Sequence, residues 1–435
     1  KYDPITHDDY YQLFAIFNQT ADNDEFDERP TVPTPTPRQQ RQLAELDGRL
    51  ALVTDAELKK KLQDARQVLV EQIPTTPIMR ELPPDQRRTT HILERGSFLQ
   101  PGEVVTPNTP EAFGHLPEET GRDRLALAHW LVSPQNPLTA RVAVNRHWQQ
   151  FFGTGLVETS EDFGTQGALP SHPKLLDWLA VQFVDRGWSM KQLCRLIVTS
   201  ATYRQSSRST VEQQRGAPRK RLHSNRPRHR LTAEQIRDLA LAAAGLLSRE
   251  IGGPSVRPPQ PKMHVNAAFG GPPIDWEPSE GGDRYRRGLY IHLRRVAPYP
   301  SMTALHATNR TQCTVRRIRT NTPVGAFVTL NDPVFIEAAQ GLAREMASHA
   351  PELEAQATHG FRRVLSRFPT QYELQQLVDL YRTELAYYAS HPGDAVTMAI
   401  KPLGEIPHES SASELAAWTV VANVILNLDE ALSKG

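Results

Sequence analysis

Cysteine is scarce in this sequence, which has only Cys194 and Cys313 among 435 residues. The pair allows one disulfide or two free thiols, and the sequence alone does not choose between them. The spacings CxxC and CxxCH and paired Cys/His motifs are all missing. Their absence argues against a zinc site and against a haem c attached covalently to this chain. The 15 histidines include no HExxH pair, so we expect no metal site.

Long hydrophobic runs and a dominant charge are missing too. No apolar run reaches the roughly 18 residues of a membrane span, so we expect no membrane span. Lys and Arg number 50 against 49 Asp and Glu, and this balance does not attract nucleic acid. The basic run 219–231 lacks interleaved aromatic residues, and we predict no nucleic-acid partner. The chain starts at Lys1 without a signal peptide, which suggests a processed or truncated product.

Familiar catalytic signatures are absent as well. The sequence has no GxSxG elbow and no phosphate-binding P-loop, which disfavours a serine hydrolase or a nucleotide enzyme. An Asp-Phe-Gly triplet at 162–164 has none of the other kinase motifs beside it.

Helix-start signals dominate what the sequence does contain. Thr6 is a good N-cap, and Ser189, Thr232 and Thr370 each have Gln or Glu three residues later, as in a capping box. Prolines are frequent, 35 in all, and several stand where a helix would begin. These patterns predict a mainly α fold: a multi-helix globular protein with small β elements and long Pro/Gly-rich loops. The apolar segment 414–430 is expected in the core.

We expect three parts along the chain: residues 1–34, 35–115 and 116–435. The middle part should form a helical hairpin arm, divided by Gly48 and the capping-box pattern Thr54–Glu57, and then an extended segment. The last part should be the main helical domain.

Three segments depart from the helical pattern. Residues 89–98 read as extended, and 288–295 alternate apolar and polar residues like a half-buried strand. Residues 252–282 are rich in Pro and Gly and should form a long irregular loop, which is often functional.

The segment NPLTARVAVNRHWQQFFGTGLV (136–157) places polar residues on a predicted helix that starts at Asn136-Pro137 and stops at Gly153. Arg141, Asn145 and Arg146 could hold a carboxylate, phosphate or sulfate, because a guanidinium offers a fork of donors. They could equally satisfy backbone carbonyls of the adjoining Gly-rich turn.

Two further clusters can likewise be interpreted either as a functional site or as local structure. Asp162 and His172 flank a Gly-rich turn and are either an acid/base pair or a turn-forming Asp and a helix-start His. Arg316, Arg317 and Arg319 precede a predicted helix start at Thr322-Pro323. They form either an anion site or a solvated basic turn that pairs with nearby acids.

Long stretches of the chain resemble the planctomycete cytochrome-c-associated proteins. Residues 1–18 look like the end of the first domain of unknown function (1549 type) in those proteins, and residues 85–430 look like a complete second one (1553 type). The quoted similarities are KYDPITHDDYYQLFAIFN, RLALAHWLVSPQNPLTARVAVNRHWQQFFGTGLVETSEDFG, PSHPKLLDWLA, GWSMKQLCRLIVTSATYRQSS, RLTAEQIRD, CTVRRIRTNTPVGAFVTLNDPVFIEAA and LNLDE.

The resemblance implies an exported, extracytoplasmic protein in which residues 1–34 are the tail of an upstream cytochrome-associated domain. It also implies a CxxCH motif ahead of Lys1, with haem c on that upstream segment or on a partner. The family supplies no established reaction and so no catalytic residues. This chain departs from the family where His306 and Asn309 stand in place of an acidic residue.

The function expected from these observations is non-catalytic: docking or assembly with a haem-bearing domain or subunit, in a complex for electron transfer. The alternatives are an extracytoplasmic enzyme acting on an anionic or polymeric, carbohydrate-like substrate, and a structural or assembly protein. In an enzyme, the candidate side chains should converge on one cleft. In a structural module, each should bind separate backbone carbonyls.

Overall fold

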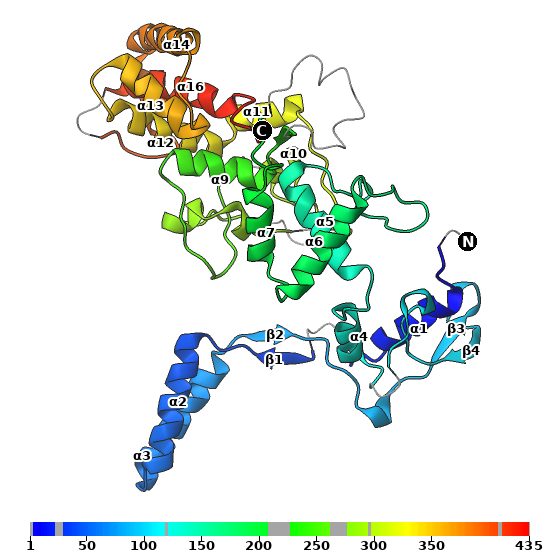
Figure 1. Cartoon of the computed structure of the whole chain (residues 1–435). Coiled ribbons are helices and arrows are strands. Elements are labelled where there is room, and N and C mark those ends of the chain that lie inside the picture. The colour runs from blue at the N-terminus through cyan, green and yellow to red at the C-terminus, as the bar shows by residue number, and fades with distance from the viewer. Residues whose placement is uncertain are drawn as a thin grey trace. The chain divides into compact units, whose positions relative to one another are not determined.

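Helices dominate the computed structural model, which describes residues 3–21, 29–117, 121–207, 227–261, 276–294, 297–407 and 411–434. They make up 53% of it, and the strands are few and short (Figure 1). The predicted mainly α class with small β elements is therefore confirmed. The chain divides into two compact units, residues 1–141 with 164–166 and residues 142–163 with 167–435. The three-part division by sequence stays a prediction.

A small core in the first unit gathers around α1 (His7–Phe17), which begins at the predicted cap Thr6. Helix α1 lies beside the antiparallel pair β3 (Thr90–Leu93) and β4 (Pro101–Val105) and contacts α4 (Arg124–Leu131). Ile16, Leu116, Ala126 and Leu127 are buried there. The strand β3 confirms the extended structure predicted for the first half of 89–98, but the prediction is wrong for the second half, where residues 94–96 form a 3-10 helix. Short 3-10 helices connect these elements: η1 (Pro84–Gln86), η2 (Glu94–Gly96) and η3 (Glu111–Phe113).

The predicted helical hairpin is present in the first unit. A ribbon of β1 (Thr31–Pro33) and β2 (Thr75–Pro77) leads into α2 (Pro37–Leu52) and α3 (Ala56–Glu71) (Figure 1). The predicted division at Gly48 is wrong, because Gly48 lies inside α2. One glycine costs a helix only about 1 kcal/mol relative to alanine. The break falls at residues 53–55, next to the predicted capping pattern Thr54–Glu57, but the cap is Asp55 and not Thr54: the Asp55 side chain accepts a hydrogen bond from Leu58 N at the start of α3.

Three helices form one core of the second unit: α5 (Thr139–Phe152), α6 (Pro173–Asp185) and α7 (Met190–Thr199). Their buried apolar faces include Val144, Trp148, Leu179 and Ile197. Helix α7 starts at the predicted cap Ser189. Helix α5 starts later than predicted, because Asn136 Oδ1 accepts from Leu138 N and Thr139 N in a tight turn just before it. It stops at Gly153, as predicted, where φ is +79°.

The larger core of this unit is built from the C-terminal helices. These are α9 (Ala233–Ala243), α10 (Pro300–Ala304), α11 (Pro323–Asn331), α12 (Pro333–Ala347), α13 (Leu353–Leu365), α14 (Gln371–Ser390), α15 (Pro392–Ile400) and α16 (Ala412–Asn427). Helices α9 and α14 begin at the predicted capping boxes of Thr232 and Thr370. Helix α16 packs along α12 and buries Trp418, which confirms the predicted core position of the last helix.

The strand predicted at 288–295 is wrong. The segment begins as a 3-10 helix, η7 (Gly288–Tyr290), preceded by η6 (Gly281–Tyr285). Of its three aliphatic residues only Ile291 is buried, in a single bridge to Val256, while Leu289 and Leu293 are exposed. The described flanks of the predicted 252–282 loop are irregular, and residues 262–275 lie outside the described residues.

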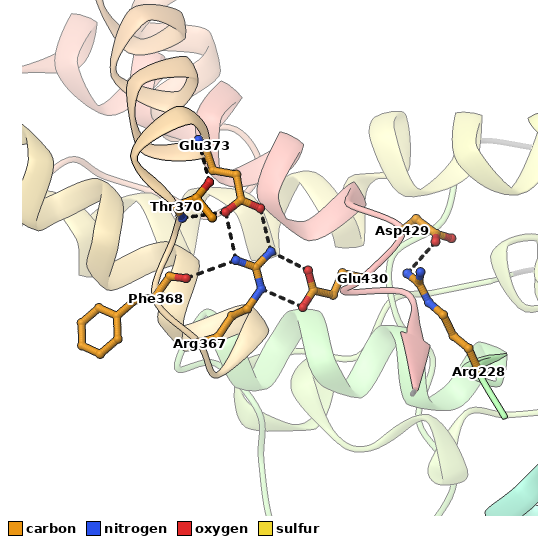
Figure 2. Close-up of polar contacts among 7 residues, drawn as sticks. All are labelled: Arg228, Arg367, Phe368, Thr370, Glu373, Asp429 and Glu430. Carbon is orange, nitrogen blue, oxygen red and sulfur yellow. Dashed lines mark hydrogen bonds and ion pairs between the residues drawn. The ribbon is translucent and has the colours of Figure 1, made fainter. Parts of the chain in front are cut away.

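Arg367 joins residue 430, near the end of the chain, to the helical core. Arg367 donates from all three guanidinium nitrogens, at 2.6–3.1 Å, to the carboxylates of Glu373 and Glu430 and to the carbonyl of Phe368 (Figure 2). Nearby, β5 (His229–Arg230) pairs with β6 (Ser433–Lys434). Bidentate pairs of this kind are stronger and more directional than single contacts.

In the ranges that the structure describes, no helix combines the length and apolar character that crossing a membrane requires.

The Arg367 network predicts an acid-dependent loss of stability. Its hydrogen bonds lower the pKa of Glu373 from 4.5 to about 2. Because the folded-state pKa is depressed, the stabilisation is complete above pH 4.5 and is lost as the pH falls from there toward 2. The groups are about one-third exposed, so we expect a contribution of about 1–2 kcal/mol.

Denaturant unfolding of the wild type and of Arg367→Ala between pH 7 and pH 2.5 measures this contribution. The variant should be less stable at pH 7, and the difference should shrink in acid. Arg382→Ala, which removes an exposed pair with Asp379, is the control and should stay within about 0.5 kcal/mol of the wild type. An Arg367→Ala difference that does not change with pH would refute the assignment.

Candidate functional site

An open cleft of about 930 Å³ lies in the second unit. Four segments line it: the end of α5 with the turn that follows, the first two turns of α9, residues 287–289, and residues 314–319. We call it the arginine cleft. Its volume is within the range of ligand sites. Its charged lining residues are Glu158, Glu234, Asp238, Arg287, Arg316, Arg317 and Arg319.

Helix α9 supplies two carboxylates one turn apart, since residues i and i+4 share a helix face. Glu234 accepts from Arg317 Nη1 at 2.8 Å and 2.6 Å, one contact to each carboxylate oxygen. Burial acts to raise the pKa of Glu234, but the hydrogen bonds and charge of Arg317 outweigh it and the pKa is lowered. Glu234 is therefore a firmly ionised partner of Arg317.

Asp238 is held differently. Its Oδ1 accepts from Gly288 N at 2.6 Å, and its Oδ2 lies 3.6 Å from Arg287 Nε. Burial raises the pKa of Asp238 above its usual value despite these contacts. The two carboxyl groups of α9 are thus shifted in opposite directions within one cleft.

A buried arginine holds segment 284–288 beside α9. Arg237 is 2% exposed and donates to the carbonyl oxygens of Arg286, at 2.6 Å, and Arg284, at 3.0 Å. Gly288 can then lie against the helix backbone, where an added Cβ would be 3.0 Å from Glu234 Cα. This close approach brings Gly288 N to Asp238.

Segment 314–319 carries the rest of the positive charge. Arg316 Nη2 lies 2.8 Å from Glu161 Oε1, and both side chains are substantially exposed. Arg319 is half-buried and makes no hydrogen bond or ion pair with another described residue. Burial, and then the neighbouring charge of Arg317, lower the pKa of Arg319.

Apolar side chains stand exposed among these arginines. Leu289 is 72% exposed, Ile318 69% and Val315 40%, and all three line the cleft. Large aliphatic groups left in water beside guanidinium groups are typical of surfaces that bind another macromolecule.

Of the candidate residues predicted from sequence, the structure brings Arg316, Arg317 and Arg319 to this cleft. The others, Arg141, Asn145, Arg146, Asp162 and His172, are not among the described residues that line it. Glu234, Asp238 and Arg287 line the cleft but were not predicted from the sequence as site residues. The signal available for the first two was their spacing in RLTAEQIRD, directly after a helix cap.

Asn145 serves the local backbone. It is fully buried; its Nδ2 donates to Val157 O at 3.0 Å, and its Oδ1 accepts from Val157 N at 2.8 Å. Gly155 passes so close that an added Cβ would lie 2.6 Å from the amide of Asn145. The amide therefore pairs with the Gly-rich turn as a neighbouring strand would, and anion binding by Asn145 is not supported.

The remaining candidates do not line the arginine cleft. Arg141 donates to the carbonyl of Pro137, in the turn before α5, and Arg146 is exposed. Asp162 closes a turn, with its amide donating to Thr159 O. His172 precedes α6, and its Nδ1 lies 3.1 Å from Ser171 Oγ. Asp162 thus lies in a turn and His172 at a helix start, and the role of each stays a prediction.

The described ranges contain both cysteines and most of the side chains that could bind a metal ion. Cys194 and Cys313 are both free thiols. Within those ranges no group of three or more His, Cys, Asp or Glu side chains is arranged to hold a metal ion.

The role of Asn145 predicts a clear stability effect. Asn145→Ala leaves the buried N–H and C=O of Val157 without partners, and we expect a loss of about 2–3 kcal/mol of unfolding free energy. The neighbouring exposed Arg146→Ala should change it by less than about 0.5 kcal/mol. Urea unfolding of both variants measures this, and equal stabilities would show that the amide is dispensable.

The chain matches the family described as protein of unknown function (DUF1553) over residues 123–381, which is more than half of its length and contains every residue of the arginine cleft. No curated protein and no solved structure matches it. The predicted resemblance to the 1553-type domain is confirmed over that range. The chain therefore belongs to the DUF1553 family of proteins of unknown function.

Proposed function

We propose that this chain is a non-catalytic docking module of an exported, extracytoplasmic protein. The arginine cleft would receive an acidic and partly apolar surface of a haem-bearing domain or subunit. The chemistry of the partner surface comes from the cleft. The haem, the export and the planctomycete origin come from the resemblance to the cytochrome-c-associated proteins, whose 1549-type domain residues 1–18 resemble.

The observation that carries the proposal is the mixture of side chains on one cleft wall. Segment 314–319 alternates the exposed aliphatics Val315 and Ile318 with arginines, and Leu289 adds a third aliphatic group. Arginine and exposed apolar groups are enriched where proteins bind proteins, and arginine is a frequent hot spot.

The state of the cleft carboxylates also favours docking over catalysis. Glu234 has both oxygens bound to Arg317, and Asp238 accepts from a backbone amide. A general base needs a lone pair directed at substrate, whereas an ion pair at the edge of a docking site tunes specificity and orientation.

The docking proposal is tested by recovering the tagged protein from its native source and recording a visible spectrum and intact masses. We expect haem absorbance and a covalently haem-linked subunit or segment in the recovered complex. Ile318→Asp places a carboxylate in the cleft and should reduce the recovered haem at least about tenfold, as expected for a hot spot.

Tyr372→Asp makes the same change at an exposed residue of α14 that does not line the cleft, and it should leave the haem content unchanged. Material from the native source that contains no haem, or an Ile318→Asp variant that recovers as much haem as the wild type, would rule out this function.

A second candidate is an enzyme acting on an anionic or polymeric, carbohydrate-like substrate. One observation favours it: Asp238 and Glu234 lie one turn apart in the cleft with pKa values shifted in opposite directions. Such divergence is how paired carboxyl groups divide the roles of acid and base.

The enzyme candidate makes its own prediction. The purified protein should release reducing ends from a sulfated or carboxylated polysaccharide, and Asp238→Asn should lower the rate at least about 100-fold, as for loss of a general acid. Asp379→Asn, on the exposed face of α14, is the matched control. No release from either class of polysaccharide would remove this candidate.

A further inference from the structure

A small recess of about 10 Å³ adjoins the arginine cleft. Thr232, Arg317, Ile318 and Arg319 line both spaces. A volume of this size holds about one water molecule or one oxygen atom. A ligand in the cleft could therefore place a single atom in the recess.

The polar residues that line the recess are basic or uncharged. The polar residues that line it are Arg230, Thr232, His306, Arg317, Arg319 and Thr320. No carboxylate is among the described residues that line it. A concave surface of one charge concentrates ions of the opposite charge.

Among the described residues, the positive charge of the recess is only partly compensated. Arg317 is paired with Glu234, and Arg230 donates to the neutral amide oxygen of Asn321 at 2.6 Å. Burial lowers the pKa of Arg230 and the charge of Asp429 acts to raise it, but the Asp429 carboxylate is itself bound to Arg228 (Figure 2). Arg319 has no ion-pair partner among the described residues. A half-buried guanidinium in this state loses hydration without gaining a counter-charge.

The backbone beside the recess is strained. His306 has φ +62°, a left-handed conformation that costs a non-glycine residue about 1 kcal/mol. In this conformation its Nε2 lies 2.7 Å from Thr320 Oγ1. Strain of this kind persists where surrounding structure enforces it, and it clusters at ligand sites.

We propose that the recess and the adjoining cleft bind an oxyanion, with one oxygen in the recess beside Arg319 and the remaining oxygens in the cleft. This inference rests on the proposed docking site and names its chemistry. The oxyanion is the anchoring group of whatever enters: the carboxylate of an acidic side chain, or a sulfate or phosphate ester.

The test is titration calorimetry of the purified full chain with sodium acetate, sodium sulfate and sodium phosphate, at constant ionic strength set with chloride. At least one of these anions should bind with a dissociation constant on the order of 1 mM. Arg319→Ala removes charge-assisted hydrogen bonds and should weaken binding at least about tenfold. Arg319→Lys keeps the charge but not the fork of donors, and should lie between the two.

Arg249→Ala is the matched control, because Arg249 is exposed and lines neither space. It should bind like the wild type, and unchanged melting temperatures of all variants exclude a folding defect. Binding of acetate alone would assign the carboxylate of a protein partner, and binding of sulfate or phosphate alone would assign an ester.

The inference is overturned if none of the three anions binds, or if Arg319→Ala binds as tightly as the wild type. Its failure differs from failure of the docking function. Anion binding that depends on Arg319 in a protein that recovers no haem would uphold the oxyanion site and dismiss the haem partner. A protein that recovers haem but shows no Arg319-dependent anion binding would uphold the haem partner and rule out the oxyanion site.

Discussion

The cleft depends on a permanent charge placed inside the core. Arg237 is almost fully buried on α9, and burying a guanidinium is costly unless it is paired or hydrogen-bonded. Its Nη1 and Nη2 donate to two carbonyls of segment 284–288, Nη1 lies 3.9 Å from Asp238 Oδ1, and Nε has no hydrogen-bond partner among the described residues. In that segment the buried Arg286 stacks on Tyr290, 3.8 Å from the ring centroid, and donates to the carbonyls of Gly252 and Pro254. The helix thereby fixes one irregular segment, and that segment fixes the next.

The same chemistry recurs across the second unit. Arg344 donates to the carbonyls of Ala399 and Gly404, and Arg363 donates to that of Ala243, at a helix end. Irregular segments lack the ladder partners that a sheet provides, yet their buried carbonyls still need donors. Arginine supplies five donors on one long side chain. In segment 314–319, Arg316 and Arg317 also pair with acids, and all three arginines of the segment line the cleft, which therefore stands out as a binding surface.

The sequence was a good guide wherever the information was local. Caps at Thr6, Ser189, Thr232 and Thr370 set helix starts within a residue or two, because a cap is a contact over three positions. The prediction of a strand at 288–295 was wrong because contacts distant in sequence determine the conformation of this segment. Arg237 binds the carbonyls just before it, and Leu289 lines the cleft and is not part of a core. The cleft combines residues from four separated segments, so their convergence had no local signal. Of the cleft residues, only Arg316, Arg317 and Arg319 were anticipated, because they lie together in one segment.

One contact in the cleft has a thermodynamic consequence. Arg317 holds Glu234 in a two-oxygen ion pair, and the same guanidinium lines the recess where an anion would arrive. Glu234 therefore competes with an incoming anion for Arg317. An incoming group gains only the difference between its attraction to Arg317 and that of the glutamate already there, so weakly coordinating salts gain almost nothing. Selectivity against the ions of the surrounding medium is therefore set by an acid in the protein's own sequence.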